Sequence, residues 1–504
     1  MSEPSPASGD IRFERLLERR MRTAGLFAGP VLGLAAYLLN PGDHSASGRK
    51  LLGVLVMAVS FWVTEAIPLP ATALLASALA IVCGVAPARA VLAPYADPVI
   101  FLFIGSFLLA QAFRKYGVDR RVAGLMLGSG TFGKSPAGLI AGFGLSSAAV
   151  STVLSNTATA ALMTPIAVGT VSRPDESGTR RAGPWAAGVL LMVAYGASIG
   201  GMATLIGTPP NLLVAGFLER LAGVKVTFTG WLGFGLPVAT VLLAIAILWT
   251  RFALRRDLAF PVPQSPAERP LVKSAAAHRA GFRWTIAAFS LAGLLWTLPA
   301  LAAAALGSDA AITRTLTERL PEAGVALLCA ALLFVAPVDW KERRFAMTWA
   351  EGHQVNWGII LLFGGGLSLG TLAETTGLAR WAGAGISNLG LSATPGGLLA
   401  VAIGITIIVS EFASNTAAAT LLVPVVIAAA QTAGFDPVRP ALGVGLAATC
   451  GFIFPVSTPP NAIVFGTGLV PLWRMIRLGI LLDLASFFVI WIGLIALTPM
   501  LPRA

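Results

Sequence analysis

The sequence predicts an all-α polytopic membrane protein with about eleven transmembrane helices, two re-entrant hairpins and two broken helices, arranged as an inverted repeat. Three observations lead to this prediction. Of the 504 residues, 56% are hydrophobic and 12% are charged, about half the charged fraction of a soluble protein. The apolar residues collect in windows long enough to cross roughly 30 Å of hydrocarbon. Two unusual polar motifs also recur in the same order in both halves of the chain.

Basic residues lie between the apolar stretches, in clusters that indicate cytoplasmic loops. The formal net charge is +12, yet no basic stripe with interleaved aromatic residues indicates nucleic-acid binding. With the N-terminus inside, the tail and five loops hold 25 of the 35 Lys and Arg residues. We therefore expect a multi-pass protein of the bacterial inner (plasma) membrane. Its N-terminus is expected to be cytoplasmic, with anionic lipid headgroups as partners.

A stretch rich in Pro and charged residues divides the chain near its middle. Its basic residues place this stretch on the cytoplasmic side, where it would link two transmembrane halves. The predicted segments are a cytoplasmic tail at 1–22, a first transmembrane half with an extra N-terminal helix at 23–254, a cytoplasmic linker at 255–283, and an inverted second half at 284–504.

Two long apolar segments, 136–170 and 394–430, carry polar clusters in their middle. These clusters are Ser155-Asn156-Thr157 and Ser414-Asn415-Thr416. Polar groups at membrane depth are tolerated only where they are buried in protein or line an aqueous cavity. Both segments are therefore predicted to be re-entrant hairpins, with Ser and Asn capping the helix that follows the tip.

Two further segments are interrupted by paired prolines. Thr208-Pro209-Pro210-Asn211 and Thr458-Pro459-Pro460-Asn461 cannot continue a helix, because proline lacks the amide donor and disfavours helical geometry in the residue before it. Each motif predicts two half-helices, the second starting near Asn211 or Asn461. Free carbonyl groups at the end of the first half-helix can bind a cation. Free amides at the start of the second favour an anion.

The order and spacing of these motifs predict a repeat. Ser414 follows Ser155 by 259 residues, and Thr458 follows Thr208 by 250 residues. An odd number of spans in each half would make the two halves antiparallel across the bilayer. Inverted repeats with interrupted helices are typical of secondary transporters, whose binding site lies near the bilayer midplane. The motifs are therefore expected to form one central site for a small anion.

None of the four motifs contains Lys, Arg or His, so a bound dianion must be balanced in another way. Neutral oxygens of Ser, Asn and the backbone suit a hard monovalent cation. Moving two negative charges inward against roughly 100 mV costs about 4.6 kcal/mol. Two co-transported Na⁺ ions would cancel this cost, and three would make uptake favourable.

These motifs resemble those of the divalent anion/sodium symporter family, which includes bacterial dicarboxylate transporters and animal citrate and dicarboxylate carriers. The resemblance also covers Trp62-Val63-Thr64-Glu65-Ala66-Ile67-Pro68 and the run from Phe452 to Val464. Thr449 departs from the family pattern, which prefers serine at this position. The resemblance implies a homodimer in which a transport region moves its site across the membrane like an elevator.

The resemblance also implies the site residues. The first Na⁺ site would use Ser151, Ser155, Asn156 and the backbone near Gly207, and the second would use Ser410, Ala413, Asn415 and Ser457. Ala413 and Ser457 would contribute mainly main-chain carbonyl groups. The substrate carboxylates would meet Asn156, Thr157, Thr208, Pro209, Asn415, Thr416, Thr458 and Pro459.

The sequence therefore predicts a carrier that imports C4-dicarboxylates (succinate, malate, fumarate) with Na⁺. A sodium-independent dicarboxylate exchanger and a sulfate or citrate carrier stay open as alternatives. An intramembrane enzyme is not expected, because no nucleophile with a base, carboxylate pair or metal cluster is visible at one depth. Glu411, beside the second Ser-Asn-Thr motif, could carry a proton. The aligned position in the first half is Thr152, which favours a structural role.

Overall fold

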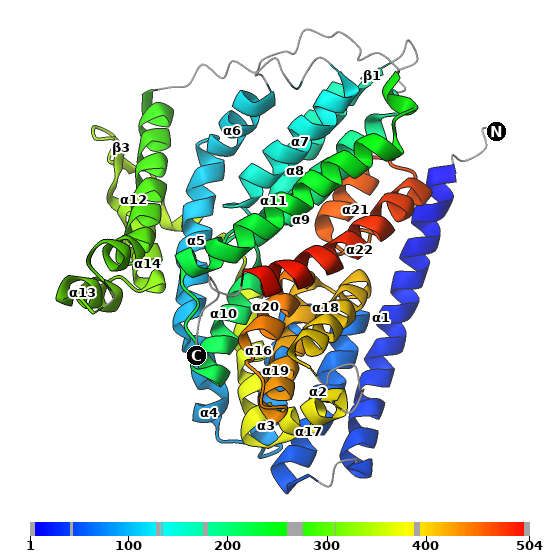
Figure 1. The fold of residues 1–504 in the computed structure, drawn as a ribbon, viewed down its shortest axis with the longest axis vertical. Helices are drawn as coiled ribbons and strands as arrows, with labels where there is room; N and C mark the ends of the chain where they lie inside the picture. The colour runs from blue at the N-terminus through cyan, green and yellow to red at the C-terminus, as the bar shows by residue number, and fades with distance from the viewer. Residues whose placement is uncertain are drawn as a thin grey trace. The chain divides into compact units, whose positions relative to one another are not determined.

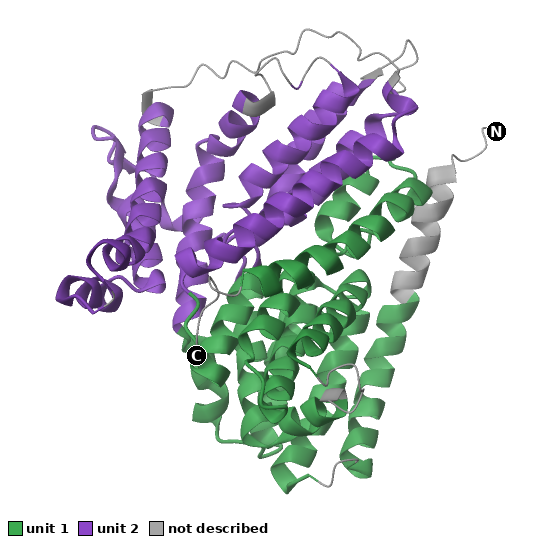
Figure 2. Cartoon of the chain, in the orientation of Figure 1, with its two compact units in different colours: residues 1–97, 209–226, 358–504 green, residues 98–208, 227–357 purple. Residues whose placement is uncertain are grey.

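The computed structural model describes residues 6–40, 44–127, 132, 135–174, 180–259, 276–307, 309–387 and 394–497. These residues are almost all helical and belong to two compact units (Figures 1 and 2). Both units are assembled from stretches far apart in the sequence. Most of the predicted linker, residues 260–275, lies outside the described residues, so the division of the chain at 255–283 stays a prediction.

Unit 1 comprises Met1–Asp97, Pro209–Val226 and Gly358–Ala504. Its first helix starts at Pro6, so the stretch predicted as a tail is helical from that residue onward. The elements of this unit are α1 (Pro6–Leu39), α2 (Ala46–Thr64), α3 (Leu69–Val82), α4 (Ala88–Leu92), the 3₁₀ helix η1 (Ala93–Ala96), α10 (Pro209–Ala222), α16 (Trp357–Thr375), α17 (Leu378–Ser387), α18 (Pro395–Phe412), α19 (Asn415–Thr432), α20 (Val438–Ala447), α21 (Pro459–Phe465) and α22 (Leu472–Ala496).

Unit 2 comprises Pro98–Thr208 and Thr227–Trp357. Its helices are α5 (Pro98–Lys115), α6 (Val118–Leu127), α7 (Pro136–Ser151), α8 (Asn156–Val171), α9 (Ala186–Met202), α11 (Phe228–Ala253), η2 (Asp257–Ala259), α12 (Ala276–Leu306), α13 (Ala311–Arg319), α14 (Glu322–Val335) and α15 (Trp349–Gly352). Two short antiparallel ribbons complete the unit, β1 (Ser172–Pro174) with β2 (Arg180–Ala182) and β3 (Pro337–Asp339) with β4 (Arg344–Phe345).

The two predicted hairpins are the helix pairs α7–α8 and α18–α19. Each first helix starts with a hydroxyl cap followed by proline. Ser135 Oγ accepts a hydrogen bond from the Gly138 amide at 3.0 Å, and Thr394 Oγ1 accepts one from the Gly397 amide at 3.1 Å. Proline after the cap is favourable because its missing amide would have no helical partner there. Both second helices start at the Asn of the Ser-Asn-Thr motif, as the sequence predicts.

The two predicted breaks are also present, and each second half-helix starts at the first proline of its motif. Helix α9 ends at Met202 and α10 begins at Pro209. Helix α20 ends at Ala447 and α21 begins at Pro459. Both starts lie two residues before the predicted asparagines, because proline at the first helical position already has the required φ angle.

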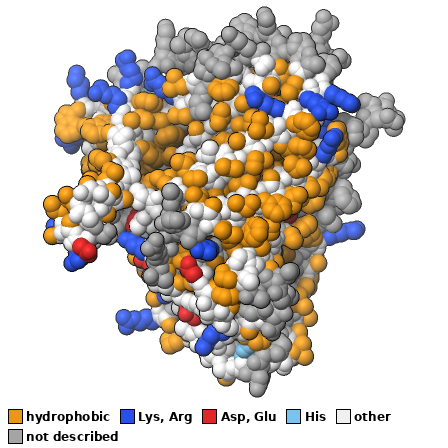
Figure 3. Space-filling model, viewed as in Figure 1, with side chains coloured by type: hydrophobic (Ala, Val, Ile, Leu, Met, Phe, Trp, Pro, Cys, Tyr) orange, Lys and Arg blue, Asp and Glu red, His pale blue; other side chains and the backbone are white. Residues whose placement is uncertain are grey.

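Within the described residues, nine helices are long and apolar enough to cross a membrane. The sequence predicts about eleven spans. The count differs because the breaks leave shorter apolar helices such as α9 and α20. Large apolar side chains, including Leu248 and Phe252 of α11, are exposed on the protein surface. Hydrophobic side chains cover much of the described face in Figure 3, as expected for a surface solvated by lipid.

Helix α9 forms the core of unit 2, and every one of its residues is buried. It packs against α7 and α8 through glycines. A Cβ added at Gly196 would lie 2.5 Å from the Gly144 carbonyl oxygen, and one at Gly200 would lie 2.2 Å from the Ala148 carbonyl oxygen. Small residues at such crossings allow membrane helices to approach closely. The α7–α8 hairpin is thus held firmly beside the broken helix that follows it.

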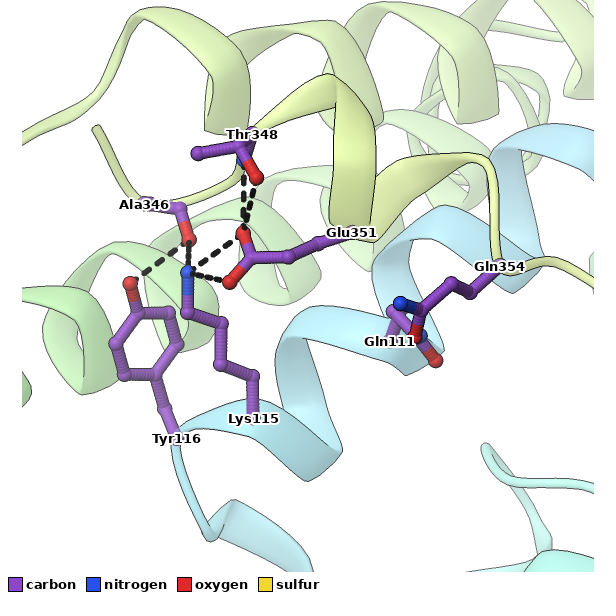
Figure 4. A network of polar contacts seen from close by, with 7 residues as sticks. All are labelled: Gln111, Lys115, Tyr116, Ala346, Thr348, Glu351 and Gln354. Carbon is purple, nitrogen blue, oxygen red and sulfur yellow. Dashed lines mark hydrogen bonds and ion pairs between the residues drawn. The ribbon is translucent and has the colours of Figure 1, made fainter. Parts of the chain in front are cut away.

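A polar network joins the end of α5 to the loop before α16 (Figure 4). Lys115 Nζ lies 2.6 Å from a carboxylate oxygen of Glu351, and the Tyr116 hydroxyl donates to the Ala346 carbonyl at 2.7 Å. Partial burial raises the pKa of Glu351. Hydrogen bonds from Lys115 and Thr348 outweigh this effect and hold that pKa below its usual value.

Candidate functional site

The first half-site is built where α7 ends and α8 begins, within unit 2. Ser155 caps α8, and its hydroxyl oxygen accepts a hydrogen bond from the Ala158 amide at 3.3 Å. The cap turns the chain so that Asn156 is the first residue of the helix. The Ser151 hydroxyl, at the end of α7, donates to Asn156 Oδ1 at 2.9 Å. Both side chains are buried.

Gly201, near the end of α9, packs against Asn156, and Gly207 packs against Gly201. A Cβ added at Gly201 would lie 2.3 Å from Asn156 Oδ1, closer than any real side chain could be. A Cβ added at Gly207 would lie 2.6 Å from the Gly201 carbonyl oxygen. The Thr204 hydroxyl also donates to the Thr152 carbonyl at 2.6 Å, which ties the break to the hairpin tip. The hairpin and the broken helix therefore form one compact cluster of oxygen atoms.

The second half-site repeats this arrangement within unit 1, where α18 ends and α19 begins. The Ser410 hydroxyl lies 3.1 Å from Asn415 Oδ1 and 2.7 Å from the Ala448 carbonyl oxygen. Because a hydroxyl has one proton, it can donate to only one of these acceptors at a time. Ser414 occupies the cap position of α19 without a side-chain cap bond. The hydroxyl–amide pair is separated by five residues in both half-sites.

The break between α20 and α21 is organised by Asn461. The Thr458 hydroxyl oxygen accepts a hydrogen bond from the backbone N–H of Asn461 at 3.3 Å and so caps α21. The Asn461 side chain donates from Nδ2 to the Gly451 carbonyl at 2.8 Å and to the Phe454 carbonyl at 3.0 Å. Asn461 thus fixes the path of the chain through the break. The sequence predicts the half-helix start near this residue but not its side-chain contacts.

Glu411 connects the tip of the second hairpin to the same break. Its carboxylate accepts hydrogen bonds from the Ile453 amide at 3.1 Å, from the Phe454 amide at 3.2 Å and from the Ser457 hydroxyl. The Ser457 hydroxyl also lies 3.1 Å from the Glu411 carbonyl oxygen. Through these contacts Glu411 connects the end of α18 to the break between α20 and α21, which is a structural role. They also give the Ser457 side chain a role that the sequence does not reveal.

The proposed site residues differ in burial. Ser151, Asn156, Thr208, Ser410, Ser457 and Thr458 are buried, whereas Thr157 and Pro459 are exposed and Asn415 is half-buried. The structure brings Ser151 into contact with Asn156 and Ser410 into contact with Asn415. Gly451 lies against Ser410, Ser457 and Thr458. For the other proposed residues, a place around the two asparagines stays a prediction. No residue that forms the contacts described for the two half-sites is basic. Both clusters therefore present neutral oxygen atoms, with Glu411 as the one acidic group among them.

A model of the sodium:sulfate symporter transmembrane region matches residues 31–501. The chain belongs to this family. The sodium-dependent dicarboxylate transporter SdcS of Staphylococcus saprophyticus is 30% identical over 494 residues, which cover 94% of this chain and 91% of the relative. SdcS of Staphylococcus aureus strain USA300 is 29% identical over 481 residues, or 92% of this chain and 89% of the relative. These findings confirm the family resemblance and establish a membrane transporter rather than an enzyme.

Two solved structures have a fold similar to that of this chain. The YdaH transporter of Alcanivorax borkumensis matches with a TM-score of 0.56 at 17% identity, covering 80% of this chain and 86% of that one. MtrF of Neisseria gonorrhoeae matches with a TM-score of 0.51 at 14% identity, covering 79% of each chain. At this level of identity the likeness concerns the fold alone, which is that of a polytopic helical transporter.

Proposed function

We propose that this protein imports C4-dicarboxylates such as succinate, malate and fumarate across the inner membrane together with Na⁺. The observation that carries the proposal is the pair of Ser–Asn contacts, Ser151 with Asn156 and Ser410 with Asn415. Each places neutral oxygen ligands at a hairpin tip, and such ligands suit a hard monovalent cation. The relatives are named sodium-dependent dicarboxylate transporters, which supports the same ion and substrate class.

In this proposal each half-site binds one Na⁺ ion. The first ion would contact Ser151, Ser155, Asn156 and the backbone at Gly207, and the second would contact Ser410, Ala413, Asn415 and the backbone at Ser457. Asn156 and Asn415 would serve both the ion and the substrate, because an amide offers an oxygen to a cation and N–H donors to a carboxylate. The other substrate contacts are proposed to be Thr157, Thr208, Pro209, Thr416, Thr458 and Pro459.

Charge balance explains why Na⁺ would be obligatory. A dianion that moves inward against roughly 100 mV meets a cost of about 4.6 kcal/mol, and two Na⁺ ions cancel it. The half-sites offer dipoles and oxygens but no basic side chain that could replace a cation. We also propose the homodimer, the elevator motion and the cytoplasmic N-terminus, for which the family resemblance and the distribution of basic residues are the support.

The test is uptake of labelled succinate into proteoliposomes that contain the purified protein. An inward Na⁺ gradient should drive accumulation, and an equal choline gradient should not. Competition by unlabelled citrate and sulfate separates the dicarboxylate carrier from the citrate and sulfate carriers. Uptake that requires unlabelled succinate inside the proteoliposomes and does not depend on Na⁺ would instead identify a sodium-independent exchanger.

A further inference from the structure

Three buried hydroxyl groups of unit 2 have no hydrogen-bond partner. Ser147 of α7, Thr159 of α8 and Ser198 of α9 are at most 1% exposed, and none of their hydroxyls bonds another described residue. A buried polar group without a partner is costly, so each one in a folded protein requires an explanation. The proposed dicarboxylate and Na⁺ contacts of the first half-site use none of these three side chains.

Helical hydroxyls usually avoid this cost. Serine and threonine in a helix can donate to the carbonyl group four residues earlier, as Ser60 does to Val56 at 2.8 Å. The hydroxyls of Ser147, Thr159 and Ser198 do not make this bond. Their oxygens are therefore available to a ligand that is not part of their own helix.

Helices α8 and α9 bring two of these hydroxyls face to face. The helices pack against each other, with Asn156 at the start of α8 against Gly201 near the end of α9. The ribbon of β1 and β2 joins their opposite ends, so they run antiparallel. Thr159 follows Asn156 by three residues, and Ser198 precedes Gly201 by three. Because residues three apart share a helix face, Thr159 and Ser198 face each other about one turn from the first half-site.

Ser147 reaches the same depth from α7. It precedes Ser151 by four residues, and the Ser151 hydroxyl donates to Asn156 Oδ1 at 2.9 Å. Helices α7 and α8 leave the hairpin tip side by side, so one turn back along α7 matches one turn forward along α8. Gly200 of α9 also packs against the backbone of Ala148, the residue after Ser147. We refer to Ser147, Thr159 and Ser198 as the hydroxyl layer.

The second half contains no such layer. The residues aligned with the hydroxyl layer are Thr406, Ala418 and Ala448. Two of them have no hydroxyl, and the Thr406 hydroxyl donates to the Ala402 carbonyl of its own helix at 2.6 Å. Both halves nevertheless have a hairpin and a broken helix. The hydroxyl layer is therefore not a requirement of that fold.

Two other hydroxyls of these helices, those of Ser146 and Thr164, are also buried and make no hydrogen bond to a described residue. Successive helical residues point about 100° apart, so Ser146 lies on a different side of α7 from Ser147. Thr164 lies more than one turn beyond Thr159 along α8. Neither belongs to the hydroxyl layer, and Ser146 offers a control at nearly the same depth.

We propose that the hydroxyl layer binds a further Na⁺ ion, one helical turn from the ion proposed at Ser151 and Asn156. This inference rests on the proposed function, because Na⁺-coupled transport supplies the ion. Hydroxyl oxygens can coordinate a hard cation without losing their protons, and water can complete its shell. A third ion would give a dianion and its cations one net positive charge, so that an inside-negative membrane potential would drive uptake.

Reversal-potential measurements in proteoliposomes count the Na⁺ ions that move with each succinate. The wild-type count should exceed by one the two ions of the half-sites. Thr159→Val replaces the hydroxyl by a methyl group of similar size. It should lower the count by one and remove the acceleration of uptake by an inside-negative potential. Thr159→Ser keeps the hydroxyl and should keep the wild-type count.

Two control variants remove a buried hydroxyl outside the layer. Thr406→Val deletes the hydroxyl aligned with that of Ser147, and Ser146→Ala deletes one on another side of α7. Both should keep the wild-type count. A count that falls as much in either control as in Thr159→Val would contradict the assignment of the ion to the hydroxyl layer.

A wild-type count of two, or an unchanged count in an active Thr159→Val carrier, would overturn the proposal and assign the hydroxyl layer to bound water. If Thr159→Val does not transport, equilibrium binding of ²²Na⁺ to the detergent-solubilised protein still decides. The variant should bind one ion fewer than the wild type, and Thr159→Ser should bind the wild-type number. Equal binding by Thr159→Val and the wild type would again overturn the proposal.

The two proposals fail in different ways. Wild-type protein that takes up succinate equally well in choline contradicts the proposed function. Wild-type protein that is driven by Na⁺, with a count that Thr159→Val does not lower, contradicts only the further ion site.

Discussion

In the first half-site the Ser151 hydroxyl lies 2.9 Å from Asn156 Oδ1, and in the second the Ser410 hydroxyl lies 3.1 Å from Asn415 Oδ1. The repeat has kept this contact although the surrounding residues differ. Thr204 donates its hydroxyl to the Thr152 carbonyl in the first half, and Ser457 comes within 3.1 Å of the Glu411 carbonyl in the second. In both halves, therefore, a contact between a hydroxyl and a carbonyl group links the hairpin tip to the helix break. The two hydroxyls belong to residues that are not aligned with one another.

The surroundings of the two half-sites differ in charge. The first contains neutral groups packed against Gly201, whereas the second contains the carboxylate of Glu411, which accepts hydrogen bonds from the break. The Ser–Asn pair recurs in both halves, whereas the Glu411 carboxylate does not. Under the proposed function the pair is the shared ion-binding unit, and Glu411 adds rigidity to one half only.

Apart from replacing the two asparagines themselves, the largest effect should come from adding one methyl group to the first half-site. Gly201→Ala places a Cβ 2.3 Å from Asn156 Oδ1, so Asn156 must move and succinate uptake should fall more than about tenfold. The aligned Gly451→Ala meets its nearest atom, Ser457 Cβ, at 3.1 Å and should lose far less. Gly169→Ala, with nothing within 4 Å, is the control. Equal losses at Gly201 and Gly451 would contradict the difference in packing.

Removing either hydroxyl should weaken Na⁺ binding. Ser151→Ala and Ser410→Ala each delete a contact worth about 1 kcal/mol, so the Na⁺ concentration for half-maximal uptake should rise roughly fivefold. The two effects should be similar, because each hydroxyl has a second carbonyl acceptor nearby but can donate to only one acceptor at a time. Ser60→Ala, which removes an ordinary helix-internal bond to Val56, should change nothing. A Na⁺ dependence that neither site variant alters would argue against ion binding at the tips.

The contacts of Glu411 and of Thr204 with the helix breaks should stabilise the protein to different extents. Glu411→Gln replaces an acceptor of three donors by a group that cannot satisfy all of them, at a cost of about 1–3 kcal/mol. Thr204→Val removes a single hydrogen bond, worth about 1 kcal/mol. Thermal unfolding in K⁺ buffer, where Na⁺ binding does not contribute, should therefore show the greater loss for Glu411→Gln. The reverse order would mean that Glu411 does not stabilise the break.

The smallest effect should come from the network outside both half-sites. The pKa of Glu351 is lowered in the folded protein, so its stabilisation is present above the usual value of 4.5 and is lost as the pH falls through the folded pKa. Glu351→Gln should lower stability by about 0–1 kcal/mol at neutral pH, because the pair with Lys115 is partly exposed. That deficit should shrink below pH 4.5. A deficit that does not change with pH would contradict this assignment.

Local sequence rules predicted the hairpin tips and the breaks well. Ser and Asn favour helix starts, and Thr-Pro-Pro starts the second half-helix at its first proline. The first half-helix ends before the motif, at Met202 in one half and at Ala447 in the other. The contacts of Glu411 and Asn461 could not be predicted in this way. Glu411 reaches donors 42 to 46 residues later in the chain, and Asn461 reaches back to Gly451. Such contacts depend on how helices pack, which the spacing of the motifs alone does not determine.

For Glu411 the sequence indicated the role but not the contacts. A comparison of the aligned positions showed that the acid is not part of the repeated chemistry, which favoured a structural role. An acid in the last apolar segment, Asp483, is expected from the sequence to face a partner helix, but the sequence does not indicate which one. The glycine one turn before it, Gly479, could have been a hint, because close helix packing in membranes needs small residues.

We propose that both Ser–Asn tips bind Na⁺ and that transport requires both. The most direct measurement is Na⁺-driven uptake of labelled succinate by Asn156→Ala and by Asn415→Ala carriers, at equal amounts of correctly inserted protein. Each substitution alone should abolish uptake while the protein stays folded. Uptake at the wild-type rate by either variant would contradict it.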